Sequence, residues 1–249
     1  MNVSREQSAP AFLPLENPLA RAAREARYRF ALEQFRGERV LEAGCGARDG
    51  AVRLAARGSW VAAVDLSRDG IRLAAHANFH PLVQYAIMDC QRLGFRDASF
   101  DLVVSFEVVE HVRDPEAYVG EMARVLKVDG CYIGSTPNRE RPDFRSNPHH
   151  VQEFSALEYR RLLSRHFAKV ELYGQNACPA VEGRGLALRR ELTRHDRLGF
   201  RRMIPQRAKD LINRTFFHLK SAHLVDAGDY DFQHDGITRA PVLVCVCKR

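Results

Sequence analysis

Short runs rich in Val, Ile and Leu alternate with amphipathic segments along this chain, and this rhythm constrains its fold more than any other feature. The apolar runs predict strands at residues 39–44, 60–67, 82–89, 100–107, 130–138, 168–174 and 240–248. Helical spacing predicts helices at 19–35, 49–57, 68–78, 114–127 and 153–167. Strands that alternate with helices in this way form a mostly parallel sheet covered on both faces. The sequence therefore predicts an α/β fold.

A long segment, residues 175–240, separates the last two predicted strands and shows no strand pattern of its own. We expect it to be a helical insertion, because residues 207–220 place five residues on one helical face: Leu211, Ile212, Thr215, Phe216 and Leu219. Residues 182–220 contain 11 Lys or Arg against four acids, which equals the net charge of +7 of the whole chain. This excess indicates either an anionic partner for the segment or a solvated arginine-rich surface.

The segment "VLEAGCGARDG" at residues 40–50 has the glycines of a nucleotide-binding turn. A turn that binds pyrophosphate needs a third glycine at the position that Asp49 occupies here, and a carboxylate there would repel the phosphates. Asp49 would not repel an adenosine cofactor that carries no phosphate. Glu42, at the end of the preceding strand, suits a cationic group of the ligand.

Two more carboxylates follow the next predicted strands. Asp65 ends the second strand, where it can accept hydrogen bonds from both ribose hydroxyls, and Asp89 ends the third, beside a candidate adenine site. Because the carboxyl ends of parallel strands meet at one edge of a sheet, we expect Glu42, Asp65 and Asp89 to line one cofactor site.

These motifs, together with "VDLS", "MDCQRLGFRDASFDLVVSFEVVEHVRDP" and "MARVLKVDGCYIGSTPN", resemble the class I S-adenosylmethionine-dependent methyltransferases over about residues 25–173 and 241–248. The resemblance implies a Rossmann-like seven-stranded sheet whose last strand is antiparallel, and S-adenosylmethionine as cofactor. It implies a methyltransferase domain at 37–174 and 241–249, an N-terminal helical cover at 1–36 and an acceptor cover at 175–240. The cofactor-binding residues that it implies are Tyr28, Glu42, Gly44, Gly46, Asp65, Leu66, Asp89, Cys90 and Phe106. Arg48 departs from the family, which usually has a third glycine there.

The segment after the fourth predicted strand, "FEVVEHV", carries candidate catalytic residues. Glu107, Glu110 and His111 share a face if the segment is helical, and His150 follows the fifth strand nearby. Such a set suits Mg²⁺, Mn²⁺ or Zn²⁺, and it is similar to the sets of small-RNA 2′-O-methyltransferases and ubiquinone-pathway O-methyltransferases. Two alternatives remain open: His111 acts as a general base without metal, or it orients the loop.

The acceptor is less constrained by the sequence. We expect O-methylation of a small-molecule, glycan or secondary-metabolite acceptor, with an anionic or lipid-linked sugar among the candidates. An RNA 2′-O-methyltransferase ranks lower because aromatic residues are few among the basic ones, and nucleic acid is not the expected partner. A non-catalytic cofactor-binding subunit is the third reading. Phe216 and Phe217 either contact a membrane surface or pack internally.

The remaining features of the sequence indicate a cytoplasmic protein. The start of the chain lacks the pattern of a signal peptide, and the apolar runs are too short to span a bilayer. The six cysteines show no CxxC spacing and no repeated framework, so we expect small buried residues and reduced thiols, with neither zinc nor disulfides favoured. The sequence does not indicate an oligomeric state.

Overall fold

The computed structural model describes residues 17–34, 37–141, 147–179, 181 and 225–249, which fall into two compact units. Of the described residues, the first unit contains 30–34, 37–141, 147–175 and 232–249. The second contains 17–29, 176–179, 181 and 225–231. The predicted domain boundaries, and the predicted role of 1–36 and 175–240 as covers, stay predictions.

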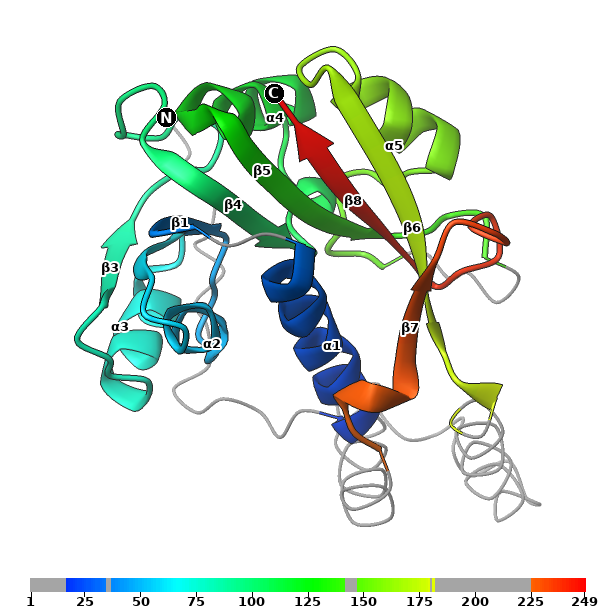
Figure 1. Ribbon diagram of the computed structural model, residues 1–249, viewed down its shortest axis with the longest axis horizontal. Helices are drawn as coiled ribbons and strands as arrows, with labels where there is room; N and C mark the ends of the chain where they lie inside the picture. The colour runs from blue at the N-terminus through cyan, green and yellow to red at the C-terminus, as the bar shows by residue number, and fades with distance from the viewer. Residues whose placement is uncertain (1–16, 35–36, 142–146, 180, 182–224) are drawn as a thin grey trace. The chain divides into compact units, whose positions relative to one another are not determined.

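An eight-stranded sheet forms the centre of the fold, in the order β3-β2-β1-β4-β5-β8-β6-β7 (Figure 1). Adjacent strands from β3 to β5 are parallel, and β8 is antiparallel to both β5 and β6. The predicted Rossmann-like α/β sheet with an antiparallel last strand is therefore confirmed, with one strand more than expected. The strands are β1 (Arg39–Ala43), β2 (Trp60–Asp65), β3 (Val83–Ile87), β4 (Phe100–Phe106), β5 (Leu126–Pro137), β6 (Lys169–Ala177), β7 (Tyr230–Gln233) and β8 (Val242–Lys248).

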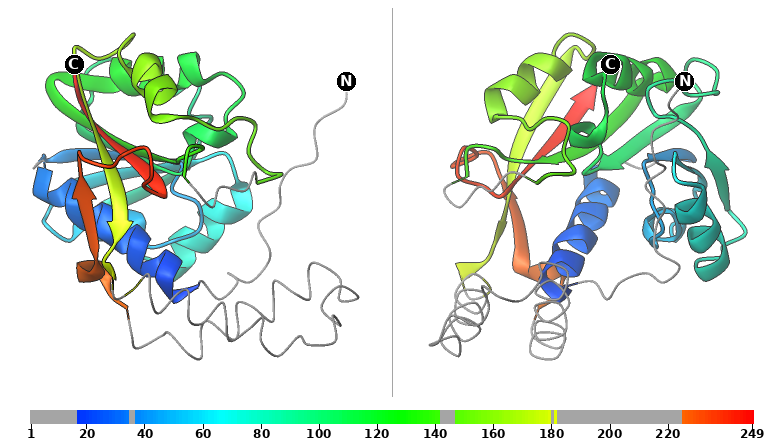
Figure 2. Two further views of the ribbon diagram at one scale, coloured as in Figure 1. Left: turned by 90° about the vertical axis from the view of Figure 1, so that its right-hand side faces the viewer. Right: turned by 180° about the vertical axis from the view of Figure 1, so that it is seen from behind.

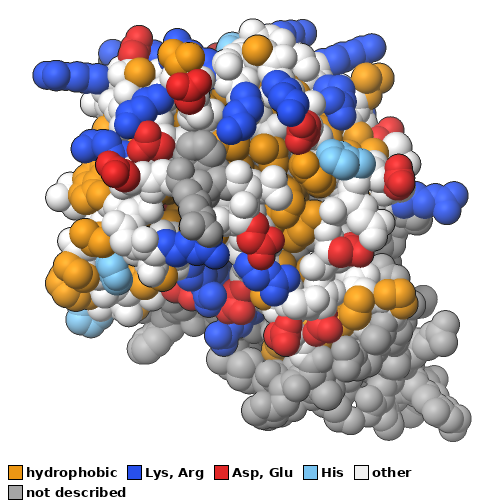
Figure 3. Space-filling view, in the orientation of Figure 1, with side chains coloured by type: hydrophobic (Ala, Val, Ile, Leu, Met, Phe, Trp, Pro, Cys, Tyr) orange, Lys and Arg blue, Asp and Glu red, His pale blue; other side chains and the backbone are white. Residues whose placement is uncertain are grey.

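The additional strand, β7, lies in the segment 175–240 that we predicted to be helical and free of strands. It has only four residues, which alternate between half-buried and exposed positions, and such a run is too short for its period to be read from sequence. The middle of the predicted insertion, residues 182–224 with the helix at 207–220 and the basic stretch at 182–220, lies outside the described residues. On the face shown in Figure 3, charged side chains of both signs are intermixed over the described part of the chain.

Within the described residues, the helices lie in segments that the sequence predicted to be helical, and α2 to α5 each follow a strand of the sheet. They are α1 (Pro18–Gln34), α2 (Gly50–Ala55), α3 (Arg68–Ala77), α4 (Pro115–Val125) and α5 (Ala156–Leu163). The strand order reverses after β1, and crossovers are right-handed, so α2 and α3 cover one face of the sheet while α4 and α5 cover the other. Figure 2 shows α4 and α5 together beside β5, β8 and β6. No helix within the described ranges is long and apolar enough to cross a bilayer.

Local sequence signals fix where these helices begin, with one exception. Ser67 and Asp114 cap α3 and α4 by accepting hydrogen bonds from backbone amides of the first turn, and Ser155 forms a capping box with Glu158 at α5. Asp49 precedes α2, as predicted, but its side chain makes no capping hydrogen bond. Asp49 instead forms an ion pair with Arg53, one turn further along the helix.

Asn138, which directly follows β5, joins three segments near the site described below. Its side-chain amide donates hydrogen bonds to the carbonyl oxygens of Ile237, Thr238 and Ala240 at 2.9–3.1 Å. It also forms an isolated β-bridge with Phe154, at the end of the loop that precedes α5. Asn138 and Ala240 are fully buried, so the amide gives the carbonyl group of Ala240 a partner in place of water, whereas the carbonyl of Ile237 also accepts from the amide of Ala240.

We predict that Asn138→Asp destabilises the protein more than Asn138→Ala does. Alanine removes the amide that donates to the buried carbonyl group of Ala240, which costs about 1–3 kcal/mol of the free energy of unfolding. Aspartate has nearly the same shape but places a carboxylate against those oxygens, and we expect a loss of about 3 kcal/mol or more. Urea unfolding measures both values. Equal stability of the aspartate variant and the wild type would contradict the role of the amide as donor.

Candidate functional site

The turn after β1 bends sharply because two glycines adopt left-handed backbone conformations. Gly44 has φ of 81° and Gly46 has φ of 57°, and residues other than glycine rarely adopt either value. The amides of Gly44 and Cys45 both donate hydrogen bonds to the carbonyl oxygen of Val64, at 2.8 and 3.0 Å. The turn therefore lies over the end of β2, at the carboxyl edge of the sheet.

Gly44 is also packed too closely for a side chain. A Cβ atom on this residue would overlap with the side chain of Val108, which follows β4. At Gly46, in contrast, a Cβ atom would meet no atom within 4 Å. Gly44 therefore fixes the contact between the segments that follow β1 and β4, whereas Gly46 borders open space on the turn.

Asp65 connects the glycine turn to the next loop. One carboxylate oxygen accepts a hydrogen bond from the amide of Gly46 at 2.8 Å, and the other accepts from the amide of Ser67 at 2.8 Å. A carboxylate offers about four acceptor positions, so Asp65 keeps capacity for the two ribose hydroxyls predicted from sequence.

The structure brings the other two predicted carboxylates to the same edge of the sheet. Glu42 is buried in β1, two residues before Gly44. The carboxylate of Asp89 accepts hydrogen bonds from the backbone and side-chain amides of Gln91, which holds the loop after β3 in a tight turn. Cys90 is buried in the core beside it.

These carboxylates make the electrostatic environment of the turn negative, as the raised pKa values of two neighbouring thiols show. Burial, and then the charges of Glu42 and Asp65, raise the pKa of the Cys45 thiol well above its usual value. Burial and the charges of Asp65 and Asp89 raise the pKa of Cys90 to about 12. Such an environment attracts a cationic ligand and disfavours a pyrophosphate.

The other residues that the resemblance assigned to the cofactor occupy different places. Leu66 directly follows Asp65, and its apolar side chain is 69% exposed at the rim of the sheet. Phe106 ends β4 and is half-buried. Tyr28 is buried in α1 within the second unit, so its predicted place over the cofactor stays a prediction.

The predicted shared helical face of Glu107, Glu110 and His111 was wrong. A 3-10 helix, η1, contains only Val109–His111, and Glu107 precedes it with a left-handed φ of 58°. The carboxylate of Glu107 turns toward β5, where it accepts a hydrogen bond from the hydroxyl of Ser135 at 2.9 Å. The unusual backbone of Glu107, which the sequence pattern does not reveal, therefore separates it from the other two residues.

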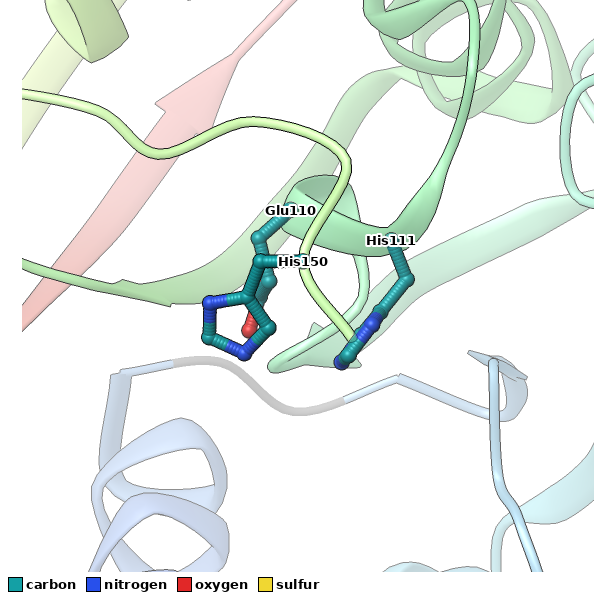
Figure 4. Close-up of side chains that lie close together, drawn as sticks. All are labelled: Glu110, His111 and His150. Atoms are coloured by element: carbon teal, nitrogen blue, oxygen red, sulfur yellow. The ribbon is translucent and has the colours of Figure 1, made fainter. Parts of the chain in front are cut away.

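Three of the four predicted metal ligands do come together. Possible ligand atoms of Glu110, His111 and His150 all lie within 4.8 Å of one another. Figure 4 shows their side chains extending toward the same side from η1 and from the loop that precedes α5. The backbone explains this proximity, because the carbonyl oxygen of Glu110 accepts hydrogen bonds from the amides of Val151 and Gln152.

The two imidazoles of this cluster have different hydrogen-bond partners. His111 is exposed, and its Nδ1 lies 3.0 Å from the carbonyl oxygen of His149. Since a carbonyl only accepts, Nδ1 carries a proton, and in the neutral imidazole Nε2 then presents a lone pair. His150 is half-buried, with Nδ1 at 2.8 Å from a carboxylate oxygen of Glu153 and Nε2 at 2.9 Å from the side-chain nitrogen of Asn147.

Sequence reasoning did not assign a role to the residues that hold these side chains in place. The hydroxyl of Thr136 donates to the fully buried carboxylate of Glu110 at 3.0 Å, as Ser135 does to Glu107. Asn147 and Glu153 hold His150. Their only signal in the sequence was their position within the segments "STPN" and "NPHHVQEF". A hydroxyl or amide group at such a position can serve several structural roles, so the pattern alone assigns none.

Comparisons with known proteins agree with this geometry. Residues 41–134 match the family model described as a methyltransferase domain. A protein of Mycobacterium tuberculosis, named a probable S-adenosylmethionine-dependent methyltransferase, is 40% identical over 129 residues, which cover 50% of this chain and 46% of its own. The ubiquinone biosynthesis O-methyltransferase of Paracidovorax citrulli is 36% identical over 117 residues, which cover 45% of this chain and 49% of its own. The chain thus spans about half the length of these relatives.

Solved structures show the same fold at low sequence identity. A Haemonchus contortus phosphoethanolamine N-methyltransferase, solved with S-adenosylhomocysteine, has a TM-score of 0.59 at 20% identity, over 90% of this chain and 52% of its own. A Thermotoga maritima S-adenosylmethionine-dependent methyltransferase has a TM-score of 0.59 at 16% identity, over 92% and 90% of the two chains. Residues 41–134 therefore match a methyltransferase domain, and the resemblance to S-adenosylmethionine-dependent methyltransferases found in the sequence is confirmed.

We predict that alanine has different effects at the two glycines of the turn. Gly44→Ala combines a left-handed backbone, which costs about 1–2 kcal/mol, with the overlap on Val108, so we expect the larger loss of stability there. Gly46→Ala has the backbone cost alone, but its methyl group enters the open space on the turn and should weaken the binding of S-adenosylhomocysteine. Thermal unfolding and calorimetric titration measure the two effects. Equal loss of stability in both variants would contradict the close packing at Gly44.

Proposed function

We propose that this protein transfers a methyl group from S-adenosylmethionine to a hydroxyl group of a small-molecule acceptor, with His111 as the general base. The observation that carries this proposal is the orientation of His111, whose Nδ1 proton is directed to a backbone carbonyl so that Nε2 presents its lone pair at an exposed position. Glycans and secondary metabolites are the acceptor classes that we favour.

The arrangement of carboxylates supports the cofactor half of the proposal. Asp65 would bind the ribose hydroxyls, Asp89 and Cys90 would contact the adenine edge, and Leu66 would cover an adenine face with its exposed side chain. The glycine turn presents Gly46 beside open space, where the methionine part of the cofactor would approach the backbone. When bound, the cofactor supplies a methyl group activated by a positively charged sulfur.

The chain's own residues have two tasks in the transfer. Binding aligns the acceptor oxygen with the methyl group, which supplies most of the acceleration in a displacement of this kind. Nε2 of His111 takes the proton of the acceptor hydroxyl while the oxygen forms its bond to the methyl carbon. The electron pair of the broken carbon–sulfur bond stays on sulfur, which leaves S-adenosylhomocysteine and a protonated His111. Water then removes this proton, since the imidazole is exposed.

A second candidate mechanism uses a divalent metal, and the proximity of Glu110, His111 and His150 favours it. Two imidazoles and one carboxylate fit Zn²⁺ or Mn²⁺ better than Mg²⁺, which prefers oxygen ligands. A metal held there would lower the pKa of the acceptor hydroxyl. We rank this mechanism second because Glu107 lies apart from the cluster and both ring nitrogens of His150 already have partners within the protein.

The names of the relatives support an oxygen acceptor without fixing its identity. Several curated relatives are ubiquinone biosynthesis O-methyltransferases. The solved structures named above include an N-methyltransferase, but that likeness concerns the fold alone. An acceptor panel of hydroxylated glycans, phenols, amines and short RNAs, tested with methyl-labelled cofactor, would identify the acceptor class. Transfer only to amines or to RNA would overturn the proposal.

Asp65→Ala should weaken the binding of S-adenosylhomocysteine about 30-fold or more, because two hydrogen bonds from the ribose to a charged acceptor are lost. Asp69→Ala is the matched control, since it removes another half-buried carboxylate four residues further along the chain. Isothermal titration calorimetry measures both affinities. An unchanged affinity in Asp65→Ala would show that the carboxylate does not contact the cofactor.

His111→Gln should lower kcat by about 10²- to 10⁴-fold, the usual contribution of a general base, while the affinity for S-adenosylhomocysteine stays unchanged. His149→Gln is the control, because it keeps the backbone carbonyl that orients His111. The same assay after exhaustive chelation separates the two mechanisms. Full activity without metal supports the general base, whereas loss of activity that Zn²⁺ or Mn²⁺ restores supports the metal.

A further inference from the structure

The loop that carries His150 contains a network of hydrogen bonds that bears directly on what this imidazole can bind. Glu153 accepts from Nδ1 of His150 at 2.8 Å, and the side-chain nitrogen of Asn147 lies 2.9 Å from Nε2. The Glu153 carboxylate also accepts from the amide of Asn147 at 3.2 Å, and the amide of His150 donates to the carbonyl of Asn147. Asn147, His150 and Glu153 therefore form a closed unit within seven residues.

The orientation of the Asn147 amide is fixed from its other side. Its side-chain oxygen accepts a hydrogen bond from the backbone amide of His149 at 3.0 Å. Since a backbone amide only donates, the oxygen must face His149 and the NH₂ group must face His150. The NH₂ group in turn only donates, so Nε2 of His150 is the acceptor and Nδ1 carries the ring proton.

The lone pair on Nε2 is the one that a metal shared with Glu110 and His111 would require, because Nδ1 is held by Glu153. His150 and Glu153 have side chains only 10% and 9% exposed, so this arrangement is well ordered by its surroundings. We propose that Asn147 acts as a latch on His150: it occupies the Nε2 lone pair, and a Zn²⁺-type cation binds only when the amide moves away. This inference rests on the second mechanism proposed above, in which the cluster holds a metal.

The latch has a consequence that distinguishes it from ordinary support of a ligand. A residue that orients a metal ligand raises metal affinity, and its removal typically weakens binding by about 10- to 100-fold. A residue that competes with the metal for the same lone pair lowers affinity. Its removal should strengthen binding, by about threefold to tenfold for one neutral hydrogen bond that no longer has to be broken.

The experiment is a titration of the metal-free full chain with Zn²⁺ against a competing chelator, in the absence of acceptor. The informative variants are Asn147→Ala and Asn147→Ser. Serine cannot reach His150 but can still accept the hydrogen bond from the amide of His149, and so keeps the turn. Asn78→Ala, at another half-buried asparagine, is the matched control, and His150→Ala removes the ligand itself. Binding of S-adenosylhomocysteine and thermal unfolding are measured on the same samples.

We expect Zn²⁺ to bind about threefold to tenfold more tightly to Asn147→Ser and Asn147→Ala than to the wild type or to Asn78→Ala, and to bind far more weakly to His150→Ala. Unchanged or weaker binding in Asn147→Ser would overturn the latch, and weaker binding would make Asn147 a supporting residue. A wild type and an Asn147→Ser variant that bind S-adenosylhomocysteine but no Zn²⁺ would also overturn it. That result would leave methyl transfer by a general base intact, whereas absence of S-adenosylhomocysteine binding would count against the proposed function itself.

Discussion

The contact between Gly44 and Val108 determines how the rest of the site is arranged. The chain reverses after β1 in a conformation that only glycine adopts readily, and it passes so close to the segment after β4 that no side chain fits between them. These two strands are neighbours at the point where the strand order reverses, which is where open α/β sheets bind ligands. One close contact therefore holds the cofactor turn against the segment that carries Glu110 and His111.

Strand ends fix the groups on both sides of this contact, although most of them stand on loops. Asp65 ties the glycine turn to the start of α3, while hydroxyl groups at the end of β5 hold Glu107 and Glu110. The backbone of Glu110 then holds the loop of His150. A displacement reaction depends on alignment, so hydrogen bonds that tie these loops to the ends of strands are what the chemistry requires.

The sequence predicted the parts of this molecule that depend on repeating patterns and on single residues with one dominant use. Runs such as "WVAAVD" favour buried strands, and a carboxylate at the end of such a run is recognisable without a structure. β7 was not predicted because four residues are too few to show the alternating apolar and polar pattern of a strand. The predicted position of Glu107 on a shared helical face was wrong because its backbone conformation follows from packing between β4 and β5. Asn147 was missed because an asparagine before Pro148 is usual in turns, and its contact with His150 depends on the fold of the loop.

The different partners of His111 and His150 explain why one cluster is compatible with two mechanisms. Both imidazoles use Nδ1 as a hydrogen-bond donor, but His111 is oriented by a backbone carbonyl at an exposed position, whereas His150 lies between a carboxylate and an amide. A carbonyl orients a base without adding charge, whereas a carboxylate makes an imidazole a stronger ligand. His111 is thus prepared to accept a proton as it stands. His150 becomes a ligand only after Asn147 releases it, so the hydrogen bond of a single amide decides which chemistry the cluster supports.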